Sequence, residues 1–192
     1  MKMRELTIRM PKNAQTTMHI KSNFKIVKRD TGISAKDLKL LQKTRAKEVK
    51  GIACSPAYVE LCEKMVNTVA ASQRIDITPI QIEMATQDAM QSSMEPLYWA
   101  ADHAKKQKNA GIKGTIGAIV GAGISIIIGT VDKCRFANMA IILAPLYVLC
   151  GGFVGSQGMK HNKEMKETYR IQAAYNIKAA TIDATLNEGR KQ

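Results

Sequence analysis

The sequence predicts a mainly α-helical protein in which long helices flank a two-helix transmembrane hairpin, preceded by a small basic α+β domain. Two runs without a charged residue, 114–131 and 136–159, indicate the hairpin. Apolar residues at helical spacing on both sides of these runs indicate the flanking helices. The first 50 of the 192 residues contain 14 basic and 4 acidic side chains, so they contribute +10 of the net charge of +13.

The first expected element is a small β-hairpin. Residues 3–10 alternate between polar and apolar side chains, and residues 16–29 are rich in Thr, Ile, Phe and Val. The turn-like connector 11–15 lies between them. A two-stranded hairpin is not stable alone, so it must pack on another part of the structure.

Two helices with recognisable start signals are expected next. Ser34 is a candidate N-cap for a helix that stops at Gly51. Ser55 followed by Pro56 opens the second helix, because proline is favoured at the first helical position. Together with the β-hairpin they form a predicted basic domain, residues 1–75.

Thr78 and Pro79 open a long helix, residues 79–113, that leads into the apolar runs. Pro96 inside this helix is expected to kink or restart it. A seam for packing against another helix is formed by Met90, Met94, Leu97, Ala101 and Ala104.

Both apolar runs are long enough to cross a membrane. At 1.5 Å per residue, residues 114–131 span about 27 Å and residues 136–159 about 36 Å, against a hydrocarbon core of about 30 Å. The short charged connector 132–135 makes the two helices antiparallel neighbours. Residues 114–159 are therefore a predicted transmembrane helical hairpin.

A carboxy-terminal helix is expected within residues 160–192, ending near Glu188 before Gly189. It should lie antiparallel to residues 79–112 and extend the hairpin beyond the membrane. One face of it is marked by Met165, Tyr169, Ala173, Ile177, Ala180 and Ala184.

Small residues recur at every fourth position of the first run and less regularly in the second. Such rows let helices approach closely in lipid and predict a homo-oligomer, although glycine is also common in membrane helices generally. The candidate helix-packing residues are Gly117, Gly121, Ser125, Gly129, Ala140, Ala144, Gly151 and Gly155. A second row beside the first consists of Gly114, Ala118 and Ala122.

Lysines are concentrated at one side of the hairpin, while the connector has only Lys133 and Arg135, partly offset by Asp132. The positive-inside rule then places both termini in the cytoplasm and the connector outside. The same lysines are candidate contacts for lipid headgroups. They are Lys105, Lys106, Lys108, Lys113, Lys160, Lys163 and Lys166.

A second basic group in the amino-terminal domain could attract a polyanion. A solvated surface that favours solubility is the alternative interpretation. The residues are Lys21, Lys25, Lys28, Arg29, Lys39, Lys43, Arg45 and Lys47.

No catalytic motif, metal site or cofactor site is predicted, so the chain is not expected to be an enzyme. Its four cysteines lack CxxC spacing and its three histidines are scattered. The start of the chain has no apolar segment typical of a secretory signal peptide.

The preferred hypothesis is a homo-oligomeric integral membrane protein that forms a pore, conduit or membrane ring within a larger phage or secretion assembly. Its partners would be the lipid bilayer, other copies of the chain and proteins of that assembly. A protein that is delivered from a virion and then inserts into a membrane would show the same sequence pattern. Two alternatives stay open: a membrane-anchored adaptor or scaffold whose basic domain binds a partner or polyanion, and a soluble polyanion-binding helical protein. Nucleic acid is a less favoured partner.

Overall fold

Five α-helices form the part of the chain that the computed structural model describes, namely residues 16–48, 55–131 and 137–188. The side chains of residues 16–22, 46–48, 125, 128–131, 137–142 and 187–188 lie outside that description. The helices are α1 (Thr16–Thr31), α2 (Ala35–Glu48), α3 (Pro56–Gln73), α4 (Pro79–Val131) and α5 (Ala137–Glu188). The mainly helical fold expected from the sequence is confirmed.

Three helices start where the capping signals predict. The Ser34 hydroxyl accepts a hydrogen bond from the backbone N–H of Asp37 at 3.2 Å. The Ser55 hydroxyl accepts one from the N–H of Tyr58 at 3.4 Å. At the start of α4, Gln81 N–H donates to the Thr78 hydroxyl at 3.4 Å and Thr78 N–H donates to Gln81 Oε1 at 2.8 Å, which is a reciprocal capping box.

The predicted β-hairpin is wrong where the structure describes it. Residues 16–29 belong to α1, while residues 3–10 lie outside the described part. The apolar positions Phe24 and Val27 and the buried Thr31 step by three and four, which places them on one helical face. The β-branched residues of this segment predicted a strand, but the spacing of its buried positions is that of a helix.

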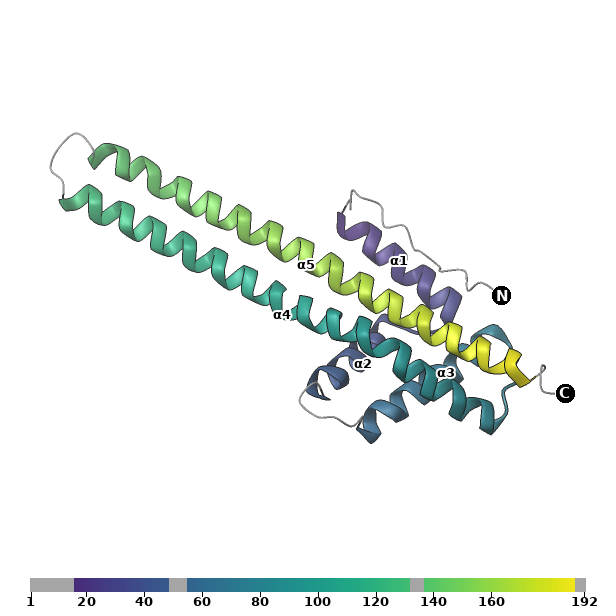
Figure 1. Cartoon of the computed structure of the whole chain (residues 1–192). Coiled ribbons are helices and arrows are strands. Elements are labelled where there is room, and N and C mark those ends of the chain that lie inside the picture. Colours follow the sequence, from purple (N-terminus) through teal and green to yellow (C-terminus); the bar gives the residue numbers. More distant parts are fainter. Residues whose placement is uncertain (1–15, 49–54, 132–136, 189–192) are drawn as a thin grey trace.

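Helices α4 and α5 form one antiparallel hairpin that extends well beyond the other helices (Figure 1). With 53 residues, α4 is about 80 Å long. The predicted segments 79–113 and 114–131 are thus one continuous helix, and the second apolar run continues without a break into the predicted carboxy-terminal helix, which ends at Glu188 as expected.

The expected restart at Pro96 does not occur. Proline has no N–H to donate to the carbonyl of Ser92, four residues earlier. In the structure Asn176 of α5 donates its side-chain N–H to that carbonyl at 2.7 Å. The neighbouring helix thus replaces the missing hydrogen bond, and α4 continues through the proline.

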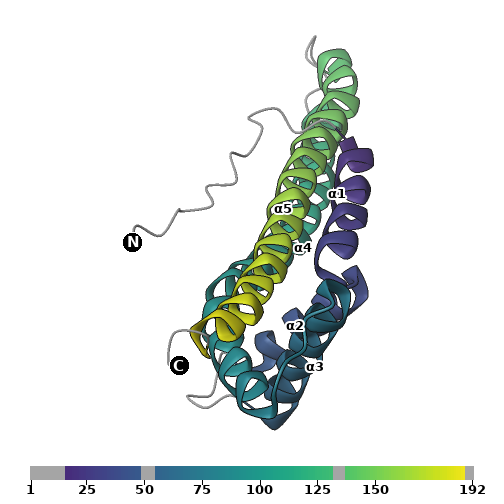
Figure 2. The ribbon, with the colours of Figure 1, turned by 90° about the vertical axis from the view of Figure 1, so that its right-hand side faces the viewer.

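The first half of α4 and the last half of α5 share one hydrophobic core with the three shorter helices. In Figures 1 and 2, α1 lies along α5, and α2 and α3 cover the side of α4. Leu38, Leu41 and Tyr58 are fully buried there, together with Leu97 and Ile177 from the hairpin. We call this five-helix part the base.

We predict that Asn176→Ala lowers the free energy of unfolding by about 1 kcal/mol, because the Ser92 carbonyl loses its donor. In a Pro96→Ala background the same substitution should have almost no effect, since alanine supplies the backbone N–H that proline lacks. Urea unfolding of the four proteins of this cycle, followed by circular dichroism, measures the coupling. Equal losses in both backgrounds would contradict the role given to Asn176.

Candidate functional site: the apolar end of the hairpin

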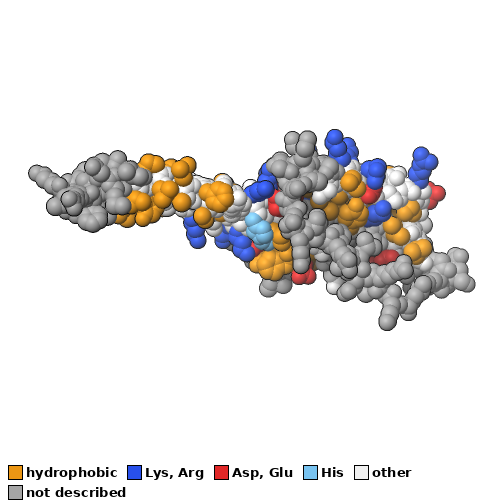
Figure 3. Space-filling model, turned by 90° about the horizontal axis from the view of Figure 1, so that it is seen from above, with side chains coloured by type: hydrophobic (Ala, Val, Ile, Leu, Met, Phe, Trp, Pro, Cys, Tyr) orange, Lys and Arg blue, Asp and Glu red, His pale blue; other side chains and the backbone are white. Residues whose placement is uncertain are grey.

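Beyond the base, the described chain consists of two helices only. The core of the base ends near Ala100 of α4 and Arg170 of α5. We call residues 114–127 of α4 and 143–159 of α5 the apolar end. We call the whole of the α4–α5 hairpin beyond the base the shaft. In Figure 3 hydrophobic side chains cluster on the apolar end of the shaft, next to lysines.

Most large side chains of the apolar end are exposed, whereas the base combines a buried core with some exposed apolar residues such as Ile80 and Leu186. Ile119 is 66% exposed, Leu149 is 70% and Val154 is 69%. Further exposed apolar residues are Ile116, Val120, Ile124, Ile126, Ile127, Leu143, Leu146, Tyr147, Val148 and Phe153. Soluble monomers rarely expose a contiguous apolar surface of this kind.

Small residues hold the two helices of the apolar end together at very short range. An ideal Cβ on Gly114 would lie 2.7 Å from the Cα of Gly155. An ideal Cβ on Gly151 would lie 3.1 Å from the Cβ of Ala118, which is itself buried. Gly121 faces the ring of Tyr147, whose atoms would lie 3.1 Å from an added Cβ. Gly114 and Ala118 of the second small-residue row and Gly121 of the first row thus lie against α5.

The other candidate packing residues have different surroundings. A Cβ on Gly117 would meet nothing within 4 Å, and the same is true of Gly123 and Gly152. Ala144 is partly buried. The side chains at positions 125, 129 and 140 lie outside the described part.

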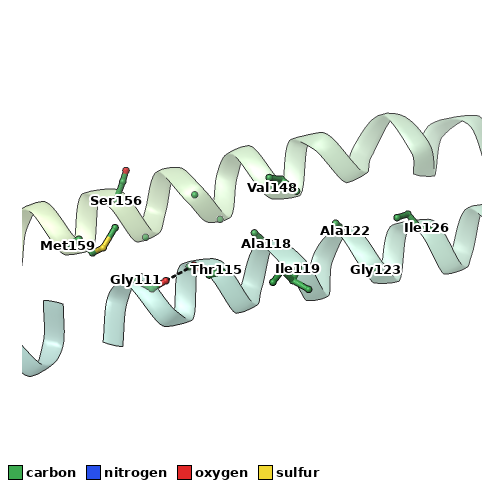
Figure 4. A pocket seen from close by; sticks show the side chains of 14 residues that line it. Gly111, Thr115, Ala118, Ile119, Ala122, Gly123, Ile126, Val148, Ser156 and Met159 are labelled. Carbon is green, nitrogen blue, oxygen red and sulfur yellow. Dashed lines mark hydrogen bonds between the residues drawn. The ribbon is translucent and has the colours of Figure 1, made fainter. Parts of the chain in front are cut away.

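An open apolar groove runs along one side of the hairpin (Figure 4). Its volume is about 640 Å³. Small residues from both helices expose backbone along it, among them Gly114, Gly151 and Gly152, and apolar side chains such as Ile119 and Val148 border it. A groove of this composition can accept the apolar face of another helix or a lipid chain.

Six of the seven predicted flanking lysines lie on the shaft below the apolar end. Lys105, Lys106, Lys108, Lys113 and Lys160 are exposed, and Lys163 is half-buried. Lys166 is different: its side chain is only 15% exposed, and its ammonium donates to Gln107 Oε1 at 2.9 Å. Burial lowers the pKa of Lys166 below its ordinary value, although the carboxylate of Glu167 opposes that shift.

The predicted polyanion-binding residues whose side chains are described come from two helices, α1 and α2. Lys25 and Lys28 are exposed on α1, and Lys39 and Lys43 are exposed on α2. Figure 1 shows α1 on the α5 side of the hairpin and α2 on the α4 side. Arg29 is ion-paired with Asp30 at 3.1 Å, and Arg45 is half-buried. The side chains of Lys21 and Lys47 lie outside the described part.

A buried polar junction connects α2 with both long helices where the base ends. Arg170 Nε donates to Gln42 Oε1 at 2.6 Å, and Gln42 Nε2 donates to the Ala100 carbonyl at 3.1 Å. Arg170 also donates to both carboxylate oxygens of Glu167 at 2.9 Å. Sequence analysis missed this junction, since Gln42 and Arg170 are 128 residues apart and follow no motif.

The same end of the base has a polar contact between α4 and α5. His103 Nδ1 donates to the amide oxygen of Asn162 at 2.8 Å, because the Asn162 nitrogen is already donating to the Gly158 carbonyl. The His103 ring stacks on Tyr169 with centroids 5.7 Å apart. These contacts set the register of the two helices just before the apolar end begins.

Among the described residues, no three His, Cys, Asp or Glu side chains lie close enough together to hold a metal ion. Counting the described residues only, no helical segment combines the length and the hydropathy needed to cross a membrane. No family model, curated protein or solved structure matches this chain.

We predict that Gly114→Ala destabilises the hairpin by about 1–3 kcal/mol, because the new methyl group overlaps the Gly155 backbone. Gly117→Ala is the matched control: its methyl group meets open space, so it should be neutral or stabilise by up to about 1 kcal/mol. Thermal unfolding in one detergent, followed by circular dichroism, compares the two variants. Equal effects would contradict the close approach at Gly114.

Proposed function

We propose that this chain is a structural membrane protein. In this proposal the apolar end of the hairpin inserts into a lipid bilayer, and the base stays in the aqueous phase. Several copies pack through their hairpins into a ring, pore or conduit. The observation that carries the proposal is the contrast between the buried core of the base and the exposed apolar residues of the two-helix end.

The dimensions of the shaft support insertion. From Ala101 to Val131, α4 extends about 45 Å beyond the core of the base. The last part of α4, residues 114–131, contains no charged residue. A helix of that length measures about 27 Å, close to a hydrocarbon core of about 30 Å.

The distribution of charge supports one orientation. Lysines lie at the base side of the apolar end, and the connector has only Lys133 and Arg135, partly offset by Asp132. Under the positive-inside rule both termini and the base would be cytoplasmic, with the connector on the opposite side.

The glycines that face open space support self-association. Glycine costs about 1 kcal/mol relative to alanine inside a helix. Gly117, Gly123 and Gly152 incur that cost without an intramolecular contact that needs it. In lipid, bare backbone of this kind allows close packing with a helix of another copy.

A membrane-anchored adaptor is the second candidate, since the same apolar end could anchor a monomer. The base would then carry the working surface. A soluble polyanion-binding protein is less well supported, because it would leave the exposed apolar residues of the hairpin uncovered.

We predict that the protein floats with phosphatidylcholine vesicles and that the membrane shields its connector from a reagent added outside. A Cys54→Ser/Cys150→Ser variant keeps Cys134 in the connector and Cys62, which is fully buried. After insertion from outside, a membrane-impermeant maleimide should label Cys134 only once the vesicles are permeabilised.

The control for this experiment adds Gln192→Cys and Cys134→Ser, and it should react without permeabilisation because the carboxy terminus stays outside. Protein left in the soluble fraction would contradict membrane insertion. Vesicle-bound protein with Cys134 freely labelled from outside would contradict a hairpin that crosses.

We predict that Gly117→Ile dissociates the assembly, since the side chain enters the open face without touching the partner helix of the same hairpin. Val120→Ile is the control, because it adds one methylene at a residue that is already exposed. Mass measurement of the detergent-solubilised particle distinguishes the two. An oligomer of unchanged mass with Gly117→Ile, or a monomeric wild type, would favour the anchored adaptor.

A further inference from the structure

A set of lysines surrounds the shaft where the apolar end begins. Lys105, Lys106 and Lys108 lie within one turn of α4, and at about 100° per residue they project over an arc of about 160°, with Lys105 and Lys108 about 60° apart. The pairs His103–Asn162 and Gly111–Met159 fix the register of the two helices. Lys160 and Lys163 of α5 therefore lie at the same height. Lys113 lies on α4 closer to the apolar end. We call these six lysines the collar.

The collar has little negative charge to neutralise it. Between Asp102 and Glu164, the described parts of α4 and α5 contain no acidic residue. Lys106 pairs with Asp102 at 2.6 Å. Within the described structure the ammonium groups of Lys105, Lys108, Lys113 and Lys160 have no carboxylate partner, and all four residues are exposed. These side chains are free to reach an external anion.

We propose that the collar binds the headgroups of anionic phospholipids and so sets the depth to which the apolar end enters the bilayer. This inference rests on the membrane insertion proposed above. The collar spans residues 105–113, about 12 Å along the axis, and adjoins a surface without charge. Lysine stems can lie along apolar surface while their ammonium groups reach the phosphates.

The arrangement favours a lipid surface over a nucleic acid. A bilayer that surrounds an inserted shaft offers phosphates in every direction at one height, which matches a collar. A nucleic acid instead contacts a basic stripe on one face of a protein. The collar is also continuous with the apolar end, so a bound nucleic acid would leave that exposed apolar surface uncovered.

The experiment measures partition of the full chain into vesicles of phosphatidylcholine, with and without phosphatidylserine, by flotation. Each lysine near an anionic surface contributes about 1 kcal/mol, or about fivefold in partition. The wild type should therefore prefer the anionic vesicles, and this preference should weaken at high salt. Lys105→Gln/Lys108→Gln should reduce partition into anionic vesicles by about 30-fold and leave partition into neutral vesicles unchanged.

The matched control, Lys36→Gln/Lys64→Gln, removes the same charge from exposed positions of α2 and α3 in the base. It should behave like the wild type on both vesicles. Circular dichroism should show that both variants fold, since none of the four lysines has an ion pair in the described structure.

Three results would overturn the inference. One is equal partition of the wild type into both vesicle types. Another is an equal loss for the collar variant and the base variant, which would indicate a net-charge effect. The last is a collar variant that binds vesicles normally but loses binding to a double-stranded DNA fragment. Failure of the wild type to enter any vesicle would instead overturn the proposed membrane insertion, and the inference with it.

Discussion

Two helices that pack against each other can bury only the stripe along which they touch. In the base α1, α2 and α3 pack on α4 and α5 and bury further faces of them. Past Ala100 and Arg170 the hairpin continues without them. Because the sequence there is apolar on all sides, isoleucine, leucine, valine and phenylalanine have to lie on the outside of the helix pair. The apolar surface of this end is therefore a consequence of having only two helices.

The apolar end is held together mainly at small residues, with the Tyr147 side chain packed against Gly121. A Cβ on either Gly114 or Gly155 would overlap the Cα of the other, and Ala118 lies against Gly151. Dispersion contacts at such short range stabilise helix pairs even where burial from water contributes little, as in lipid. The same small residues leave a groove open along the hairpin, so one feature of the sequence accounts for both the internal contact and the unfilled surface.

The boundary between the two halves of the molecule is polar. The Gln42–Arg170–Glu167 junction, the His103–Asn162 hydrogen bond and the buried Lys166 lie where the base ends, and the collar of exposed lysines follows. Paired polar groups inside the shaft fix its register, because a buried donor or acceptor left without a partner is costly. Unpaired lysines outside the shaft remain available to an external partner. The transition from protein core to apolar surface thus takes place over a few helical turns.

The sequence by itself determined the helices and the chemistry of each segment. Capping residues at Ser34, Ser55 and Thr78 marked three helix starts, and the charge-free runs marked the part that lacks a polar face, because both are local properties. For residues 16–29 composition favoured a strand, and only packing against the base revealed the helical face of Phe24 and Val27. Tertiary structure alone decided that Asn176 compensates for Pro96, that Gly114 faces the partner helix while Gly117 faces open space, and that Lys166 is buried while Lys160 is exposed. Each of these depends on how two helices are rotated against each other, which is set by contacts between residues far apart in the chain.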